Sequence, residues 1–313
     1  MALGYDEFDV SDVTTYPLTS RPSKVDVSQF GAAFDPGSGI AGWLASLPDI
    51  LAGADLRAVV AALRAAREAG RPIVWGLGGH VIKTGLAPVF VDLMARGYVS
   101  AIAMNGAAMI HDFEIAVGGR TSEDVEAALG PGTFGMADET GAGLNKVIND
   151  GVSWGQGIGQ SVSKYLAAAD VEFRGLSVLA EAGARSIPVT VHVAIGTDII
   201  HIHPAASGAA LGVGSLRDFR YLTSAVAQLA GGVYVNCGSA EVLPEVFLKA
   251  VALVRNRGIS LDGLTTVNLD FIRQYRPQTN VVHRPTVGCG KGYSLVGHHE
   301  LLIPLLAACL VDA

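Results

Sequence analysis

The stretch that decides the fold is RPIVWGLGGHVIKTGLAPVFVDLMARGYVSAIAMNGAAMIHDFE, residues 71–114. Residues 72–75 are apolar and rich in β-forming side chains, which predicts a buried strand. A glycine turn and a helix follow, and Gly97 ends the helix before a second strand at 99–104. Two strands joined by a helix form a right-handed parallel unit. Ligands bind beyond the carboxyl ends of such strands.

The rest of the chain continues this alternation of strands and helices. We expect further strands at 187–194, 232–235 and 264–267, a short extended piece at 280–283, and helices at 55–69, 144–184, 216–229, 242–256 and 298–311. The glycine-rich residues 130–143 are expected to form a functional or mobile loop. The prediction is one doubly wound, Rossmann-like α/β domain with a mostly parallel sheet over 51–313, preceded by an irregular N-terminal arm over 1–50.

Bulk composition narrows the class of protein. Half of the 313 residues are apolar and 16% are charged, which favours a large core and surface buried in a homo-oligomer. The net charge of −7 argues against a nucleic-acid partner. Three cysteines without a CxxC pair are typical of reduced thiols in a cytoplasm. With no signal-peptide pattern and no apolar run of membrane-spanning length, we expect a soluble cytoplasmic protein without a membrane partner.

Several polar residues lie where they could carry chemistry. His111 follows the second strand and can move a proton near neutral pH. Asp198 precedes His201 and His203, which alternate along a segment expected to be extended, so both would face one side. With His192 or His111 they could bind a metal, but a closed zinc site needs four ligands, and we expect pocket residues and no metal. Lys291, between glycines, could be a reactive amine or a phosphate clamp.

The turns after the strands carry the candidate ligand groups. The segment GLGGHVIKTG, residues 76–85, could cradle the phosphates of a dinucleotide with its backbone N–H groups, or could be a tight turn without a ligand. It matches neither GxGxxG nor a phosphate loop. Asn105 could bind a ribose or a carbonyl, and Asp112 could bind sugar hydroxyls or could cap the following helix. Cys237 is expected to be a buried, inert thiol.

The order of these motifs resembles the deoxyhypusine synthase family. The resemblance runs from residue 73 to the end of the chain and rests on the segments GLGGHVIKTG, VSAIAMNGAAMIHD, GTDIIHIHP, GGVYVNCGS, VNLD, Arg276-Pro277 and LLIPLL. It implies a Rossmann-like NAD-binding domain, tetramers with sites between subunits, and transfer of an aminobutyl group from spermidine to a protein lysine. The family's catalytic lysine is absent, because its place reads Val282-His283-Arg284. A guanidinium cannot form the imine intermediate.

These observations lead to one hypothesis with three alternatives. We expect a deoxyhypusine synthase-like enzyme that uses NAD on a small polar or amine-bearing substrate, with His111 as acid or base and Asp198 and His203 beside it. The NAD site would comprise Gly78, Gly79, His80, Thr84, Asn105, Gly106, Asp112, Gly238, Ser239 and Asn268. The first alternative is a true deoxyhypusine or homospermidine synthase, which is a transferase, with Lys291 as the nucleophile. The second is a nucleotide-binding sensor without catalysis. The third is a metal-dependent hydrolase that uses histidines.

Overall fold

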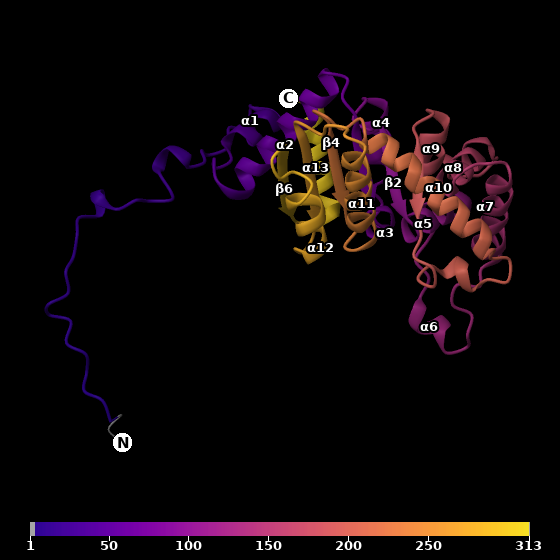
Figure 1. Ribbon diagram of the computed structural model, residues 1–313, viewed down its shortest axis with the longest axis horizontal. Helices are drawn as coiled ribbons and strands as arrows, with labels where there is room; N and C mark the ends of the chain where they lie inside the picture. Colours follow the sequence, from indigo (N-terminus) through magenta and orange to yellow (C-terminus); the bar gives the residue numbers. More distant parts are fainter. Residues whose placement is uncertain (1–3, 313) are drawn as a thin grey trace.

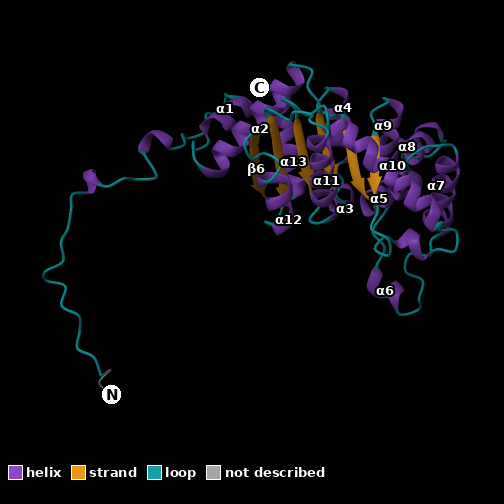
Figure 2. Cartoon of the chain, in the orientation of Figure 1, coloured by secondary structure: helices purple, strands orange, loops and turns teal. Residues whose placement is uncertain are grey.

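The fold is a doubly wound parallel sheet, as the sequence predicts. The computed structural model describes residues 4–312. Six strands, all parallel, follow the order β3-β2-β1-β4-β5-β6 (Figure 2). Their bounds are β1 Ile73–Leu77, β2 Ala101–Asn105, β3 Val189–His192, β4 Val233–Cys237, β5 Leu264–Asp270 and β6 Gly290–Val296. This is the Rossmann order, in which the direction of winding switches between β1 and β4.

Helices cover both faces of the sheet (Figure 1). The larger are α1 Gly39–Ser46, α2 Leu51–Glu68, α4 Ala87–Ala95, α5 Gly106–Gly118, α7 Leu144–Ser153, α8 Ile158–Ala168, α9 Val178–Ala184, α10 Gly208–Val226, α11 Val242–Asn256 and α13 His299–Val311. Shorter helical pieces are α3 Gly79–Lys83, α6 Val125–Leu129, α12 Tyr275–Pro277, η1 Leu18–Ser20, η2 Val27–Gln29, η3 Glu139–Gly143, η4 Arg174–Leu176, η5 Ile199–Ile202 and η6 Gln278–His283. No helix within residues 4–312 is long and apolar enough to cross a membrane.

The four inner strands, β2, β1, β4 and β5, divide their side chains between two apolar cores. On β1, Ile73, Trp75 and Leu77 join a core that includes residues of α2, α4, α5 and α13. Val74 points the other way, into a core formed with residues of α10 and α11. Burial on both faces removes apolar surface from water on each side of the strand, and this is favourable for apolar side chains at every position. This explains the continuous apolar run that identified β1 in the sequence.

The N-terminal arm lies apart from these cores. From Gly4 to about residue 38 the chain contains only the short turns η1 and η2 and is largely exposed. Figure 1 shows it running away from the body until α1, which packs near α13. Large apolar side chains stay exposed along it, among them Tyr5, Phe8 and Tyr16.

One expectation about the C-terminal third is wrong, and one strand there was not expected from the sequence. Residues 280–283 are not extended, since they belong to the helical turn η6. Residues 290–296 form the edge strand β6, which the glycines at 288, 290 and 292 concealed in the sequence. Those glycines permit close backbone packing: a Cβ at Gly290 would lie 1.9 Å from the Leu264 carbonyl oxygen, and one at Gly292 would lie 2.0 Å from that of Val282.

The other edge strand, β3, is tied to α10 by side chains. Asp218 is fully buried, and its Oδ2 accepts hydrogen bonds from the backbone N–H groups of Gly159 at 2.8 Å and Val191 at 2.9 Å. Ser215 Oγ accepts one from the N–H of Val193 at 3.2 Å. Burial raises the pKa of Asp218 to about 7, although these backbone hydrogen bonds oppose the rise.

Candidate active site

A pocket lies at the carboxyl edge of the sheet, between α3, α5 and the segment after β3. Its volume is about 260 Å³, and its walls include the α6 region, which projects from the body in Figure 1. It is lined by Lys83, Ala107, Ile110, His111, Glu114, Ser122, Glu123, Val125, Phe134, Thr197, Asp198 and Ile199. Three carboxylates and one ammonium group therefore surround a space that fits a small molecule.

A chain of hydrogen bonds fixes His111 in this pocket. Glu114 lies one turn further along α5, and its Oε2 accepts a hydrogen bond of 2.5 Å from Thr121 Oγ1. Because the single hydroxyl proton of Thr121 goes to the carboxylate, Thr121 Oγ1 must accept from His111 Nδ1, 2.7 Å away. Thr140 donates to the other Glu114 oxygen at 2.9 Å. The neutral ring thus carries its proton on Nδ1.

The other ring nitrogen of His111 is left available to a ligand. Nε2 makes no hydrogen bond with any residue in the described part of the chain. Burial lowers the pKa of His111, Lys83 lowers it further by repulsion, and Glu114 raises it. The ring is accordingly neutral at pH 7, with an unprotonated nitrogen that can act as a base.

Asp198 contributes a carboxylate to the same pocket. Its Oδ2 is buried and has no hydrogen-bond partner, and it lies 3.8 Å from His201 Nε2, which is also buried and unpaired. A Cβ on Gly106 would lie 2.0 Å from this oxygen, so the carboxylate sits against the N-terminus of α5. Burial raises the pKa of Asp198 to about 6. The helix dipole and the missing side chain at Gly106 together accommodate a negative charge there.

His201 and His203 do not alternate along an extended segment. His201 lies within the helical turn η5, and His203 follows it. The His203 ring packs on Gly141, where a Cβ would lie 2.3 Å from Cδ2, and its Nδ1 accepts from the N–H of Ala205 at 3.1 Å. His203 is not among the residues that line the pocket. Among residues 4–312 no group of three His, Cys, Asp or Glu side chains is placed to hold a metal ion.

Two other candidates lie away from the pocket. Asp112 is fully buried and caps α9, accepting from Ser177 Oγ at 2.5 Å and from the N–H groups of Val178 and Leu179 at 2.8 and 2.9 Å. Burial raises its pKa to about 6. Asp112 is therefore a helix cap and cannot contact a cofactor. Lys291 begins β6, in register with Thr265 at the start of β5, so it lies at the amino edge of the sheet, opposite the pocket.

The glycines of the strand-end turns are used for packing within the protein. A Cβ on Gly78 would lie 2.0 Å from the Gly238 carbonyl oxygen, and Gly78 N–H donates to the Cys237 carbonyl at 2.8 Å. A Cβ on Gly79 would lie 3.0 Å from Ala107 and 3.1 Å from His111. Gly238 adopts φ +64°. These contacts explain the glycines without an open cradle for phosphate, and the Asn105 side chain caps α5 by accepting from Ala108 N–H at 2.9 Å.

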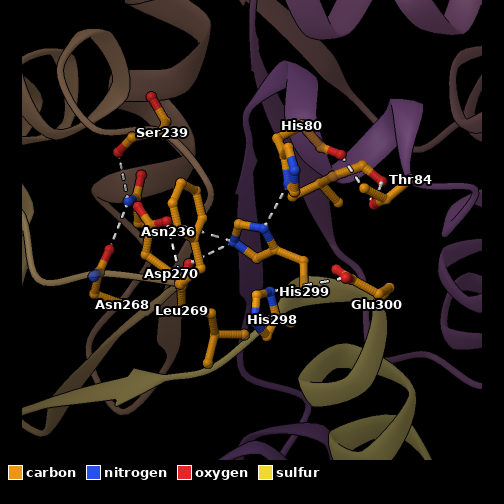
Figure 3. Close-up of polar contacts among 12 residues, drawn as sticks. His80, Thr84, Asn236, Ser239, Asn268, Leu269, Asp270, His298, His299 and Glu300 are labelled. Carbon is orange, nitrogen blue, oxygen red and sulfur yellow. Dashed lines mark hydrogen bonds and ion pairs between the residues drawn. The ribbon is translucent and has the colours of Figure 1, made fainter.

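The remaining turn residues form a polar cluster on the β4–β5 side (Figure 3). Asn236 Nδ2 donates to the Ser239 carbonyl at 2.9 Å and to Asn268 Oδ1 at 2.8 Å. Thr84 Oγ1 donates back to the His80 carbonyl at 2.9 Å. His80 Nδ1 lies 3.0 Å from Nδ1 of His299, a buried residue that begins α13. Ser239 and Asn268 are buried, so they stabilise the turns from inside the protein.

Sequence reasoning missed six polar residues of these two clusters. Lys83, Glu114 and Glu123 line the pocket, Thr121 is hydrogen-bonded to His111, and Asp270 and His299 belong to the cluster of Figure 3. One signal was available: Glu114 follows His111 by three residues on a helix, a spacing that places both side chains on one face. The pairing of His80 with His299 spans 219 positions, and no local pattern could indicate it.

Comparison with known proteins relates the chain to other proteins by fold alone. No family model matches the sequence, and no curated protein matches it. A putative LOR/SDH protein from Methanococcus maripaludis S2 superposes with a TM-score of 0.53 and 16% identity, over 84% of this chain and 70% of that one. The cyanobacterial arginine dihydrolase ArgZ gives a TM-score of 0.51 and 20% identity, over 84% of this chain and 33% of that one.

Two further structures bear on the expectations. AgrE, solved with ornithine and NAD+, gives a TM-score of 0.52 and 18% identity, over 82% of this chain and 32% of AgrE. This chain thus spans about a third of ArgZ and AgrE. A putative deoxyhypusine synthase from Entamoeba histolytica gives a TM-score of 0.48 and 12% identity, over 89% of this chain and 95% of that one. That score is too low to support the family resemblance. The shared feature is the Rossmann-like fold.

Proposed function

We propose that this chain is an enzyme that uses NAD to act on a small, polar, amine-bearing molecule held in the His111 pocket. The observation that carries the proposal is the chain from Glu114 through Thr121 to His111, which leaves a neutral Nε2 without a partner beside the carboxylates of the pocket. A base held in one tautomer and surrounded by negative charge suits a substrate that arrives as an ammonium ion.

Each pocket residue has a distinct part in this proposal. Glu123 and Asp198 attract the ammonium group. Lys83 is the one cation among the lining residues, and the three carboxylates outnumber it, so the pocket keeps a net negative charge. His111 Nε2 takes a proton from the substrate. The Nδ1 proton stays on its hydrogen bond to Thr121, and Glu114 stabilises the imidazolium that forms, in the way that a buried carboxylate orients a catalytic histidine.

The NAD half of the proposal rests on the fold and on one protein of similar fold. It is favoured by the Rossmann strand order and by AgrE, a protein of similar fold that was solved with ornithine, itself an amine, and NAD+. The glycines of the turns pack against the protein and do not identify a phosphate site. We therefore assign no chemical step to NAD. The hypothesis still includes a relationship to the deoxyhypusine synthases in which the lysine chemistry has been lost. It also still includes a tetrameric assembly.

Calorimetry followed by turnover tests the two halves separately. We expect NAD+ to bind, and NADH fluorescence to appear on addition of ornithine or spermidine. His111→Gln should abolish the turnover and leave NAD+ binding intact. Absence of binding at millimolar NAD+ would contradict the use of NAD and leave only the part of the proposal that concerns the His111 pocket. Binding of NAD+ without turnover of any amine would instead favour a nucleotide sensor. Gly79→Val is unsuitable as a probe, because its side chain would collide with Ala107 and His111.

A further inference from the structure

A second set of titratable groups lies on the other side of Gly79, outside the pocket. His80 follows Gly79 at the start of α3 and is only partly buried, whereas His299 is fully buried at the start of α13. Asp270 ends β5 and is 4% exposed. Figure 3 shows the three side chains in a row, with His299 between His80 and Asp270. None of them lines the His111 pocket.

The hydrogen bonds of this row define where its protons are. His299 Nε2 lies 3.2 Å from the Leu269 carbonyl oxygen, which can only accept, so Nε2 carries a proton. In the neutral His299 ring Nδ1 is then bare, and it must accept from His80 Nδ1 at 3.0 Å. The His80 proton is thus on Nδ1, and His80 Nε2 is left with a free lone pair. Geometry alone fixes both tautomers.

We propose that His80, His299 and Asp270 form a second acid–base site that takes a proton from a hydroxyl-bearing ligand. The ligand's O–H bond breaks as a new N–H bond forms at His80 Nε2. His80 Nδ1 passes its own proton to His299 Nδ1, which returns His80 to neutrality in the other tautomer. His299 becomes an imidazolium whose Nε2 lies 3.8 Å from Asp270 Oδ1. One proton enters, and one positive charge is stored inside the protein.

The carboxylate makes this transfer feasible. A cation at the first residue of a helix is opposed by the helix dipole, so His299 needs an adjacent negative charge to become an imidazolium. Asp270 supplies it, although burial raises its pKa. Burial has the largest effect on the pKa of His80 and lowers it. Repulsion by His299 on α13 and by Lys83 on α3 lowers this pKa further, and Glu300 on α13 and Asp270 on β5 raise it.

The outer end of the row is suited to a ligand with an apolar part. Phe271 directly follows Asp270, and its ring centroid lies 5.6 Å from that of His80. Phe271 is 46% exposed, which leaves part of the ring free to contact a ligand. A hydroxyl group at His80 Nε2 would place the attached carbon skeleton beside this ring, and aromatic contacts of that kind favour a planar apolar group.

Nitrogen NMR of the imidazole rings tests the relay. We expect His80 Nε2 to be unprotonated in the neutral protein, and His299 Nδ1 to become protonated as the pH falls through the titration of His80. In Asp270→Asn, His299 should stay neutral and His80 itself should become the cation. His298→Gln is the matched control, since it removes an exposed neighbouring histidine and leaves the three groups of the row in place. A His80 ring protonated on Nε2, or an unchanged His299 during its titration, would overturn the proposal.

Phenol and anisole test the ligand class, because they differ in the hydroxyl proton. Phenol should shift the His80 Nε2 resonance, and anisole should leave it unchanged. Phe271→Ala should weaken phenol binding by roughly three- to tenfold, the usual range for loss of one aromatic contact. Equal responses to phenol and anisole, or no response to either at millimolar concentration, would show that His80 does not accept a proton from a hydroxyl ligand.

Discussion

His111 Nδ1 lies 2.7 Å from Thr121 Oγ1, and this contact decides which nitrogen of the ring faces a substrate. His111→Gln removes the base, and we expect the NAD-coupled turnover to fall by about 10²- to 10⁴-fold, the usual contribution of a general base. Thr121→Val keeps the base but removes the hydrogen bond that holds the proton of His111 on Nδ1. We therefore expect kcat to fall less than in His111→Gln and the KM to change little. Initial rates over pH check both. Equal activity of His111→Gln and wild type would rule out His111 as the base.

Lys83 and Lys291 form a matched pair of lysines on opposite edges of the sheet. Lys83 lines the pocket and lowers the pKa of His111 by repulsion, so Lys83→Ala should raise that pKa and move the acid limb of the rate profile to higher pH. Lys291→Ala should leave the profile unchanged, because Lys291 lies at the amino edge. A loss of activity in Lys291→Ala alone would contradict the placement of the site.

Covalent trapping gives an independent check on the transfer chemistry. Borohydride added with spermidine and NAD+ should leave Lys291 unmodified in peptide mass spectra, since the strand register places it away from the pocket. An aminobutyl adduct on Lys291 that disappears in Lys291→Ala would revive the synthase hypothesis. Lys83, the lysine that does line the pocket, provides the internal comparison in the same spectra.

Asp218 should make stability depend on pH in an unusual direction. Its folded pKa, about 7, lies above the ordinary value of 3.8, so the stabilisation is complete below about pH 4 and is lost as pH rises through 7. The stability of wild type minus that of Asp218→Asn should therefore fall by up to about 4 kcal/mol between pH 4 and 8. Urea unfolding measures it, with the exposed Asp262→Asn as control. A pH-independent difference would contradict a raised pKa.

Assembly is the last expectation open to a direct measurement. The low charge of the sequence and the apolar side chains exposed along the arm predict a homo-oligomer, and the family resemblance predicts a tetramer. Light scattering at micromolar concentration should report it. Deletion of residues 1–30 should lower the subunit number if the arm joins subunits, and residues 4–30 lie outside both apolar cores. A monomeric full-length chain would refute the expectation.

The sequence was sufficient for features that depend on local pattern. The strand–helix–strand unit at 71–114, the helix at 242–256 and the parallel sheet follow from apolar runs and helical spacing, and the structure confirms them. The sequence pattern did not predict β6, because its glycines allow close backbone contacts and interrupt the apolar pattern. The turn at 278–283 was mistaken for an extended piece because Val281 and Val282 are β-forming residues buried in a helical turn.

The candidate site was less predictable, since its chemistry depends on contacts across the chain. His111 and Asp198 were selected as separate residues, and the fold brings them to one pocket. The role of Asp112 could not be read locally, because its partners begin at Ser177, 65 residues away. Lys291 appeared suited to catalysis by its glycine neighbours, but only the register with β5 shows which edge of the sheet it occupies.

The side chains that α10 places on β3 have a consequence for how copies of this protein can associate. Val191 lies in the edge strand β3 and Val193 directly follows it, and their outward N–H groups already donate to Asp218 and Ser215. An incoming strand would find no free donor at these positions. At the opposite edge β6 carries the exposed Lys291, a charge that discourages strand addition. Growth of the sheet from subunit to subunit is disfavoured at both edges, which favours assembly through helices, loops or the arm.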